Sequence, residues 1–379
     1  MIYIIILSAI LLPLFAKNKP LALIGSMLIL FIPWGMQYEM VNDWPGNLER
    51  WRLITRYLSK DIVDGSGREL EGIYVYLVKF FKDFGFFGWL MLSAVFNLSI
   101  IYLLTRKYVP KEYYWVVIFI LMIRINYGFL FINSNRQSFA VFTTVVASLV
   151  LCNENFKNFF LRNIYTRILL AIGLILMAKN MHSSAIFAFA MIPLYLIAKN
   201  VKKLNLWLIA IVNVLFFARF VFNADVLQDR ILMYMDMIGV QDVYDSYITL
   251  LDTKRVQIST IENIIYFSIM NAALFMYNKF STPIKYFALC TVLSIILGGF
   301  MTGNLGRICQ YYYIYMIVLV PSIVATLPNT NYEFFKKYRK PIYSVIILYL
   351  IYAFIREIHM EFYIAWTNFR TVLSAPMWI

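Results

Sequence analysis

Long apolar runs occupy most of this sequence, and mostly short polar segments separate them. A run of about 20 mostly apolar residues is long enough to cross a bilayer as a helix. Open strands cannot cross, because unpaired backbone groups are too costly in hydrocarbon. The runs also lack the alternation that is typical of a transmembrane barrel. The pattern therefore predicts an all-α polytopic membrane protein.

The amino-acid composition agrees with this class. Apolar residues make up 62% of the 379 positions and charged residues 14%, against roughly 45–50% and about 25% in soluble domains. The net charge of +14 does not indicate nucleic-acid binding, because the basic residues lie between the apolar runs rather than on one soluble face. The three cysteines fit no metal or disulfide spacing, and we interpret them as packing residues.

Twelve apolar runs define the predicted spans. They cover about Ile2–Ala16, Leu21–Gln37, Trp89–Thr105, Tyr113–Phe131, Gln137–Cys152, Ile168–Ala178, Ser183–Ala198, Leu204–Phe222, Ile261–Tyr277, Ile284–Thr302, Ile308–Leu327 and Ile342–Ile355. We expect residues 1–379 to form a single membrane domain. Its two longer outer loops, 38–87 and 223–260, are expected to contain interfacial or re-entrant helices, above all in the aromatic segment Gly72–Phe87.

Loops rich and poor in lysine and arginine alternate along the chain. One set of loops holds groups such as Lys199, Lys202 and Lys203, whereas the short loops of the other set hold one basic residue each, for example Lys179. Cytoplasmic loops carry the excess of basic residues. We therefore place the rich set in the cytoplasm and both termini outside. The long outer loop 38–87 is also basic, but long loops follow the rule poorly.

Arginines form the main group of candidate site residues. Ionisable side chains inside a membrane or at its rim are costly, so each is a functional candidate. Guanidinium groups stay charged and bind phosphate oxygens in pairs, so an outer cluster predicts an anionic ligand such as a pyrophosphate. The structural alternative is that arginines at helix ends reach to lipid headgroups. The candidates are Arg136, Arg307 and Arg219 at the outer face and the deeper Arg124.

One histidine and two carboxylates complete the candidate site. His182 begins a predicted span at the outer face, and a histidine can serve as proton donor, base or phosphate ligand. Asp43 and Glu71 lie in the outer loop and are candidates for the base that deprotonates a sugar hydroxyl. The alternatives are a packing histidine and solvated carboxylates. No motif for ATP hydrolysis or structural zinc occurs, so we expect no metal and no cofactor.

The order of several short motifs resembles the EpsG / O-antigen polymerase (Wzy-like) family of bacterial exopolysaccharide and capsule polymerases. The motifs are Asn42-Asp43-Trp44, Glu71-Gly72-Ile73-Tyr74, Arg136-Gln137-Ser138-Phe139-Ala140, His182-Ser183-Ser184, and Arg307 before Tyr311, Tyr312 and Tyr313. Two motifs depart from the family. The family often has Gly-Thr-Asp at the first motif and Glu-Pro at the second, which bears on the roles of Asp43 and Glu71.

The resemblance implies an inverting glycosyl transfer at the outer face of the bacterial cytoplasmic membrane. Donor and acceptor would be oligosaccharide repeat units linked to undecaprenyl pyrophosphate. Arg136 and Arg307, with Arg124 or Arg219, would hold the leaving pyrophosphate. Glu71, Asp43 or His182 would act as the base. A chain-length regulator or a flippase is a candidate protein partner, beside the lipid bilayer itself.

Two other function classes remain as alternatives. A transporter that flips lipid-linked oligosaccharide fits twelve helices and a central Arg124, but such proteins often show repeated halves, which we do not find in this sequence. A membrane acyltransferase that modifies surface glycans would also use a histidine. Such enzymes usually place an acidic or arginine partner in the same motif, and His182 has none adjacent.

Overall fold

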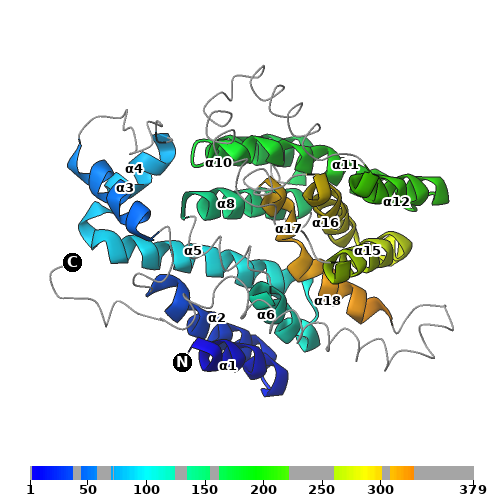
Figure 1. The fold of residues 1–379 in the computed structure, drawn as a ribbon, viewed down its shortest axis with the longest axis horizontal. Helices are drawn as coiled ribbons and strands as arrows, with labels where there is room; N and C mark the ends of the chain where they lie inside the picture. Colours follow the sequence, from blue (N-terminus) through cyan, green and yellow to red (C-terminus); the bar gives the residue numbers. More distant parts are fainter. Residues whose placement is uncertain are drawn as a thin grey trace. The chain divides into compact units, whose positions relative to one another are not determined.

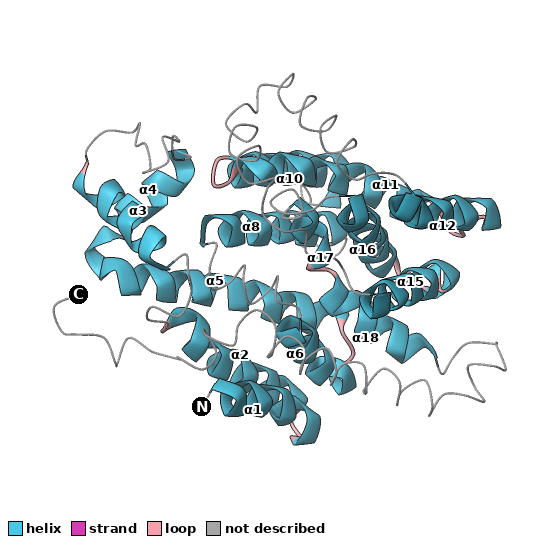
Figure 2. Ribbon diagram, in the orientation of Figure 1, coloured by secondary structure: helices cyan, strands magenta, loops and turns pink. Residues whose placement is uncertain are grey.

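The protein is described here from a computed structural model, and all regular structure in its described part is helical (Figure 2). The structure describes residues 2–36, 44–57, 70, 72–123, 135–153, 162–221, 260–300 and 308–327. No strand occurs within these ranges. The predicted all-α class is therefore confirmed for this part of the chain.

The described part of the chain is a succession of helices (Figure 1). The α-helices are α1 Ile2–Phe15, α2 Lys19–Gly35, α3 Trp44–Arg56, α4 Gly72–Phe80, α5 Gly85–Tyr108, α6 Tyr114–Ile123, α8 Asn135–Cys152, α10 Ile164–Lys179, α11 Met191–Asn200, α12 Leu206–Val221, α15 Thr260–Phe275, α16 Thr282–Phe300, α17 Gln310–Tyr313 and α18 Met316–Thr326. Short 3-10 helices are η1 Lys82–Phe84, η2 Lys111–Tyr113, η3 Ser183–Ala190 and η4 Tyr277–Lys279.

The predicted apolar runs coincide with helices wherever the structure describes them. The shortest run, Ile168–Ala178, is part of the 16-residue helix α10. This helix begins four residues before the run, includes Arg167, and ends one residue after the run at Lys179. The aromatic segment after residue 71 contains helix α4 and η1, and its last residues from Gly85 onward already belong to α5. That this segment is interfacial or re-entrant stays a prediction. The predicted span 342–355 and the outer loop 223–260 up to residue 259 lie outside the described residues.

Two helical stretches among the described residues are long and apolar enough to cross a membrane, judged by length and composition. They are Lys82–Tyr108 with 27 residues and Ser183–Asn200 with 18 residues. The shorter apolar helices of 10–17 residues are Lys19–Gly35, Arg136–Cys152, Leu206–Ala218, Asn263–Phe275, Thr282–Gly298 and Gln310–Thr326. These apolar helices are consistent with a membrane protein.

The Cα positions cluster into two compact units. Unit 1 consists of Met1–Phe142, Asn180–His182 and Val324–Ile379, and unit 2 of Thr143–Lys179 and Ser183–Ile323. Each unit is described by itself below. That the whole chain forms one membrane domain stays a prediction.

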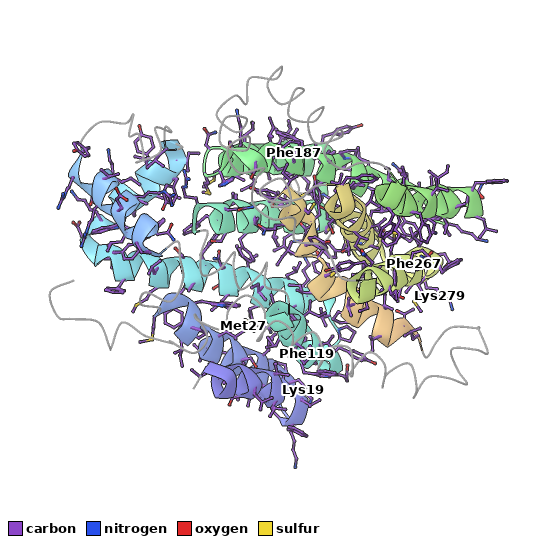
Figure 3. The ribbon with its side chains drawn as sticks, viewed as in Figure 1. Lys19, Met27, Phe119, Phe187, Phe267 and Lys279 are labelled. Carbon is purple, nitrogen blue, oxygen red and sulfur yellow. The ribbon has the colours of Figure 1, made fainter. Side chains whose placement is uncertain are left out.

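A tight helical hairpin of α1 and α2 lies at the start of unit 1 (Figure 1). The Ser26 hydroxyl donates a hydrogen bond to the Ala9 carbonyl across the hairpin at 2.7 Å, and a Cβ added at Gly25 would lie 2.6 Å from a methyl carbon of Leu12. Small residues let helices approach closely in a membrane. At the turn, the Lys19 ammonium (labelled in Figure 3) donates to the Pro13 and Leu14 carbonyls at the end of α1.

Helix α16 is the packing centre of unit 2, where α11, α12, α15 and α17 all contact it. The buried Ser148 hydroxyl of α8 lies 2.6 Å from the Tyr286 hydroxyl of α16 and 2.5 Å from the Tyr315 hydroxyl. Such shared hydroxyl contacts satisfy polar groups that would otherwise be costly to bury. The polar side chains of this core therefore connect neighbouring helices.

A second polar contact in unit 2 joins α12 to α15. The Asn213 amide donates to the Asn271 Oδ1 at 3.0 Å, and the Asn271 amide donates back to the Asn213 Oδ1 at the same distance. Each amide also donates to a carbonyl of its own helix, at Ile209 and at Phe267. The pair thus uses both N–H groups of each amide in an otherwise apolar helix interface.

Candidate functional site

The candidate site of unit 1 is built on the first turn of α8. Arg136 is the second residue of this helix and is half-buried. Its guanidinium carbon lies 5.9 Å from the ring centroid of Tyr74, which belongs to α4. Tyr74 is only 2% exposed. A cation over an aromatic face is attracted by the ring quadrupole, more strongly where water is excluded. The ring therefore fixes where the positive charge sits.

Stacked aromatic side chains support the Tyr74 ring. Trp89 of α5 contacts Tyr74 edge to face at 5.9 Å and stacks on Phe139 of α8 at 5.1 Å. Phe139 in turn stacks on Phe96, about two turns beyond Trp89 on the same side of α5, with 5.3 Å between the ring centroids. Because Phe139 follows Arg136 by three residues, the two side chains lie on one side of α8. The same aromatic cluster thus positions both the helix and its arginine.

A buried hydrogen bond fixes the start of α8 to α5. The Asn97 amide donates to the Ser138 hydroxyl at 3.2 Å, and both residues are almost fully buried. The Asn97 Oδ1 has no hydrogen-bond partner among the described residues. A polar pair in apolar surroundings is costly to separate, because each group would be left unsatisfied. The contact therefore holds the turn that carries Arg136.

His182 belongs to the same compact unit as Arg136. The short segment Asn180–His182 is part of unit 1, although α10 before it and η3 after it are part of unit 2. His182 is half-buried. The prediction that these two residues serve one site is compatible with this grouping. Ser184, the last residue of the motif that begins at His182, belongs to unit 2. Its hydroxyl shares a hydrogen bond of 3.0 Å with the Tyr311 hydroxyl.

The remaining predicted site residues are not placed by the structure. Asp43, Glu71, Arg124 and Arg307 lie outside the described residues. Arg219 lies on helix α12 of unit 2, and its side chain is outside the described part. Their roles stay predictions. Within the described residues, no group of three or more histidine, cysteine or acidic side chains could hold a metal ion.

Two contributors to the site were not foreseen from the sequence. Tyr74 is part of a quoted motif, but its contact with Arg136 depends on the way α4 folds against α8. Asn97 lies inside the apolar run Trp89–Thr105. A strongly polar side chain within a predicted span is a signal that the sequence offered, because such residues usually face a helix neighbour and carry a role.

The apolar helices of the described residues point to a class, that of helical membrane proteins. A sequence profile narrows this class, because the profile of the EpsG family matches residues 21–371. The chain belongs to the EpsG family, as the motif resemblance predicted. The family is associated with polysaccharide biosynthesis by glycosyltransferase-like polymerases. Neither the curated proteins nor the solved structures include a match to this chain.

Proposed function

We propose that this protein polymerises oligosaccharide repeat units that are linked to undecaprenyl pyrophosphate. The growing glycan leaves its pyrophosphate carrier and joins a hydroxyl of the acceptor unit, with inversion at the transferred sugar carbon. The carbon–oxygen bond to the pyrophosphate breaks, the new glycosidic bond forms, and the hydroxyl proton goes to a base. Membership of the EpsG family supports the polymerase class.

One observation carries the assignment to unit 1, and it is the Arg136 side chain held over the buried Tyr74 ring. A half-buried guanidinium is a strong anion ligand, because its charge is permanent and its N–H groups match phosphate oxygens. Charge develops on the pyrophosphate as it leaves, and a fixed cation stabilises this charge without having to reorganise. Tyr74, Trp89 and Asn97 supply that fixed position.

The other residues take roles that follow the family resemblance. By this resemblance, Arg307, with Arg124 or Arg219, binds pyrophosphate oxygens. Glu71 or Asp43 accepts the proton of the attacking hydroxyl, and His182 binds phosphate or acts as the base instead. Since the arginines neutralise the diphosphate, the proposed reaction uses no metal.

The proposed topology has twelve spans with both termini outside, in the bacterial cytoplasmic membrane. The loops that are rich in lysine and arginine support this direction. It places the reaction at the outer face, where lipid-linked donor and acceptor units meet in the bilayer. A chain-length regulator or a flippase would act beside the polymerase in this compartment.

A reconstituted polymerisation assay tests the proposal. The full chain is purified, placed in proteoliposomes with lipid-linked repeat units, and its products are separated by length. Arg136→Ala is expected to lower turnover by about a hundredfold to a thousandfold, the usual cost of removing one group that stabilises developing charge. Arg136→Lys keeps the charge and should retain part of the activity.

The chain offers a matched control at Arg106. Its guanidinium carbon lies 5.8 Å from the Tyr102 ring, but the side chain is exposed at the other end of α5. Arg106→Ala should polymerise normally. If Arg136→Ala folds and polymerises as fast as Arg106→Ala, the pyrophosphate role is wrong. If the liposomes move labelled carrier between leaflets but form no polymer, the protein is a flippase.

A further inference from the structure

One end of unit 2 carries a group of lysines that the proposed reaction does not use. We call this group the lysine end; its members are Lys199, Lys202, Lys203, Lys279 and Lys285. Lys199 closes α11, Lys202 and Lys203 lie in the connection to α12, Lys279 closes η4, and Lys285 lies in the first turn of α16. Four different elements therefore contribute positive charge.

A direct contact shows that these elements meet. The half-buried Lys285 ammonium donates a hydrogen bond of 2.9 Å to the Lys202 carbonyl. The same ammonium lies 5.1 Å from the ring centroid of the buried Tyr277 in η4. Lys285 thus ties the Lys202–Lys203 turn to α16 and η4. The turn is held in place, so its two exposed lysine side chains start from a fixed backbone.

The antiparallel packing of α12 against α15 brings Lys279 to the same end of unit 2 as the Lys202–Lys203 turn. Asn213 pairs with Asn271, while Phe216 and Phe217 both contact the Phe267 ring at 5.3 Å (Phe267 and Lys279 are labelled in Figure 3). As the numbers rise along α12 they fall along α15, so the helices are antiparallel. The start of α12 therefore lies beside the end of α15, where η4 and Lys279 follow.

The sequence on either side of these lysines contains no carboxylate. The chain has no aspartate or glutamate from residue 155 to 224 or from 263 to 332. Lys202 and Lys203 have no ion-pair partner within the part of the chain that the structure describes. The charges of the neighbouring Lys202 and Lys203 repel one another, and a bound anion removes this cost.

An apolar helix face begins directly beside the charged turn. Trp207 of α12 is 77% exposed, and Ile211, Val214 and Phe217 follow it at 54%, 67% and 52%. Their spacing of three or four residues puts them on one stripe of the helix. Tryptophan prefers the boundary between headgroups and hydrocarbon. The stripe therefore matches an acyl chain, with Trp207 at the level of the lipid headgroup.

We propose that the lysine end and this stripe form a binding site for an anionic phospholipid. The phosphate of the headgroup lies against Lys202 and Lys203, with further attraction from Lys199 and Lys279. The acyl chain lies along α12 from Trp207 toward Phe217. Lys285 is a positioning residue, because its own ammonium is engaged by the Lys202 carbonyl and the Tyr277 ring. The site is independent of the proposed polymerase reaction.

Native mass spectrometry of the purified full chain measures this binding. Phosphatidylglycerol is titrated against zwitterionic phosphatidylcholine, and the first retained lipid is counted at each concentration. Lys202→Gln combined with Lys203→Gln should weaken phosphatidylglycerol binding about thirtyfold, since each lysine near an anionic lipid contributes about fivefold. Phosphatidylcholine binding should not change. Thermal unfolding in phosphatidylcholine nanodiscs confirms that the variant is folded.

A control of equal charge change separates a site from diffuse attraction. Lys17 and Lys111 are exposed lysines of unit 1, and their double glutamine variant should bind phosphatidylglycerol as the native chain does. Equal losses in both double variants would overturn the proposal, as would equal affinity of the native chain for the two lipids. If millimolar inorganic phosphate displaces the lipid completely, the site binds phosphate alone and the acyl stripe has no part.

The positioning role of Lys285 has its own readout. Lys285→Met removes the bond to the Lys202 carbonyl but leaves both exposed lysines in place. It should weaken phosphatidylglycerol binding several-fold, and Lys285→Arg, which can still donate to the carbonyl, should restore most of it. Unchanged binding in Lys285→Met shows that the turn needs no anchor and removes that part of the proposal.

Discussion

The paired amides of Asn213 and Asn271 allow a quantitative test of how α12 and α15 are held together. Replacing either asparagine with leucine removes both interhelical hydrogen bonds at once. In the double variant, the second substitution removes no additional hydrogen bond between the two helices, because the first has already removed both. The two substitutions should therefore be strongly non-additive, and a double-mutant cycle isolates the coupling.

The size of the coupling follows from the two bonds. Interhelical hydrogen bonds in a membrane contribute on average about 0.6 kcal/mol each, so the pair predicts about 1.2 kcal/mol. The free energy of unfolding is measured by titration with dodecyl sulfate in mixed micelles. Native chain, Asn213→Leu, Asn271→Leu and the double variant are compared under one condition.

A second cycle supplies the control. Ser268 lies on α15 close to Asn271, but its hydroxyl donates to the Ile264 carbonyl of its own helix. Asn213→Leu combined with Ser268→Ala should therefore be additive within about 0.3–0.5 kcal/mol. If the two asparagine substitutions are additive to the same degree, the amides do not hold these helices together.

Three further predictions concern the Tyr74 ring, the Arg167 guanidinium and the buried cysteines. Tyr74→Leu should lower the polymerisation rate about five- to tenfold, since it removes the ring under Arg136. Tyr74→Phe keeps the ring and should retain the rate. Equal polymerisation rates for the two variants would contradict the cation–π contact. Arg167→Met should lower the free energy of unfolding by about 1.5–3 kcal/mol, because the buried guanidinium donates to the Leu151 carbonyl at 2.7 Å, and Arg167→Lys should cost less. Maleimide should label the three buried cysteines only after denaturation, and rapid labelling of the folded protein would show that they are accessible; they are Cys152, Cys290 and Cys309.

Hydropathy predicted the positions of the helices well, because consecutive apolar residues carry the information locally. Helix ends were harder. Helix α10 begins before the apolar run, since Arg167 is buried by contacts with Leu151 and Tyr195. Those partners come from α8 and α11, and no local pattern shows that a charged residue will find them. Arg167 was predicted to lie in a loop, and it is part of α10 because of these contacts with other helices.

The sequence predicted the charged residue of the candidate site, Arg136, but not the residues that hold it in position. Arg136 stood out because an ionisable side chain at the start of an apolar run is costly. The contact with Tyr74 and the bond between Asn97 and Ser138 join segments that are far apart in the chain. Such contacts arise from tertiary packing, which one sequence without its fold does not display.

The hairpin of α1 and α2 has a consequence for how the protein is made. Its closing contacts, from Lys19 to the end of α1 and from Ser26 to Ala9, join residues that are near in the chain. Short loops close quickly and cost little entropy. The pair can therefore assemble as soon as this stretch has left the ribosome, and enter the bilayer as one preformed unit against which later helices dock.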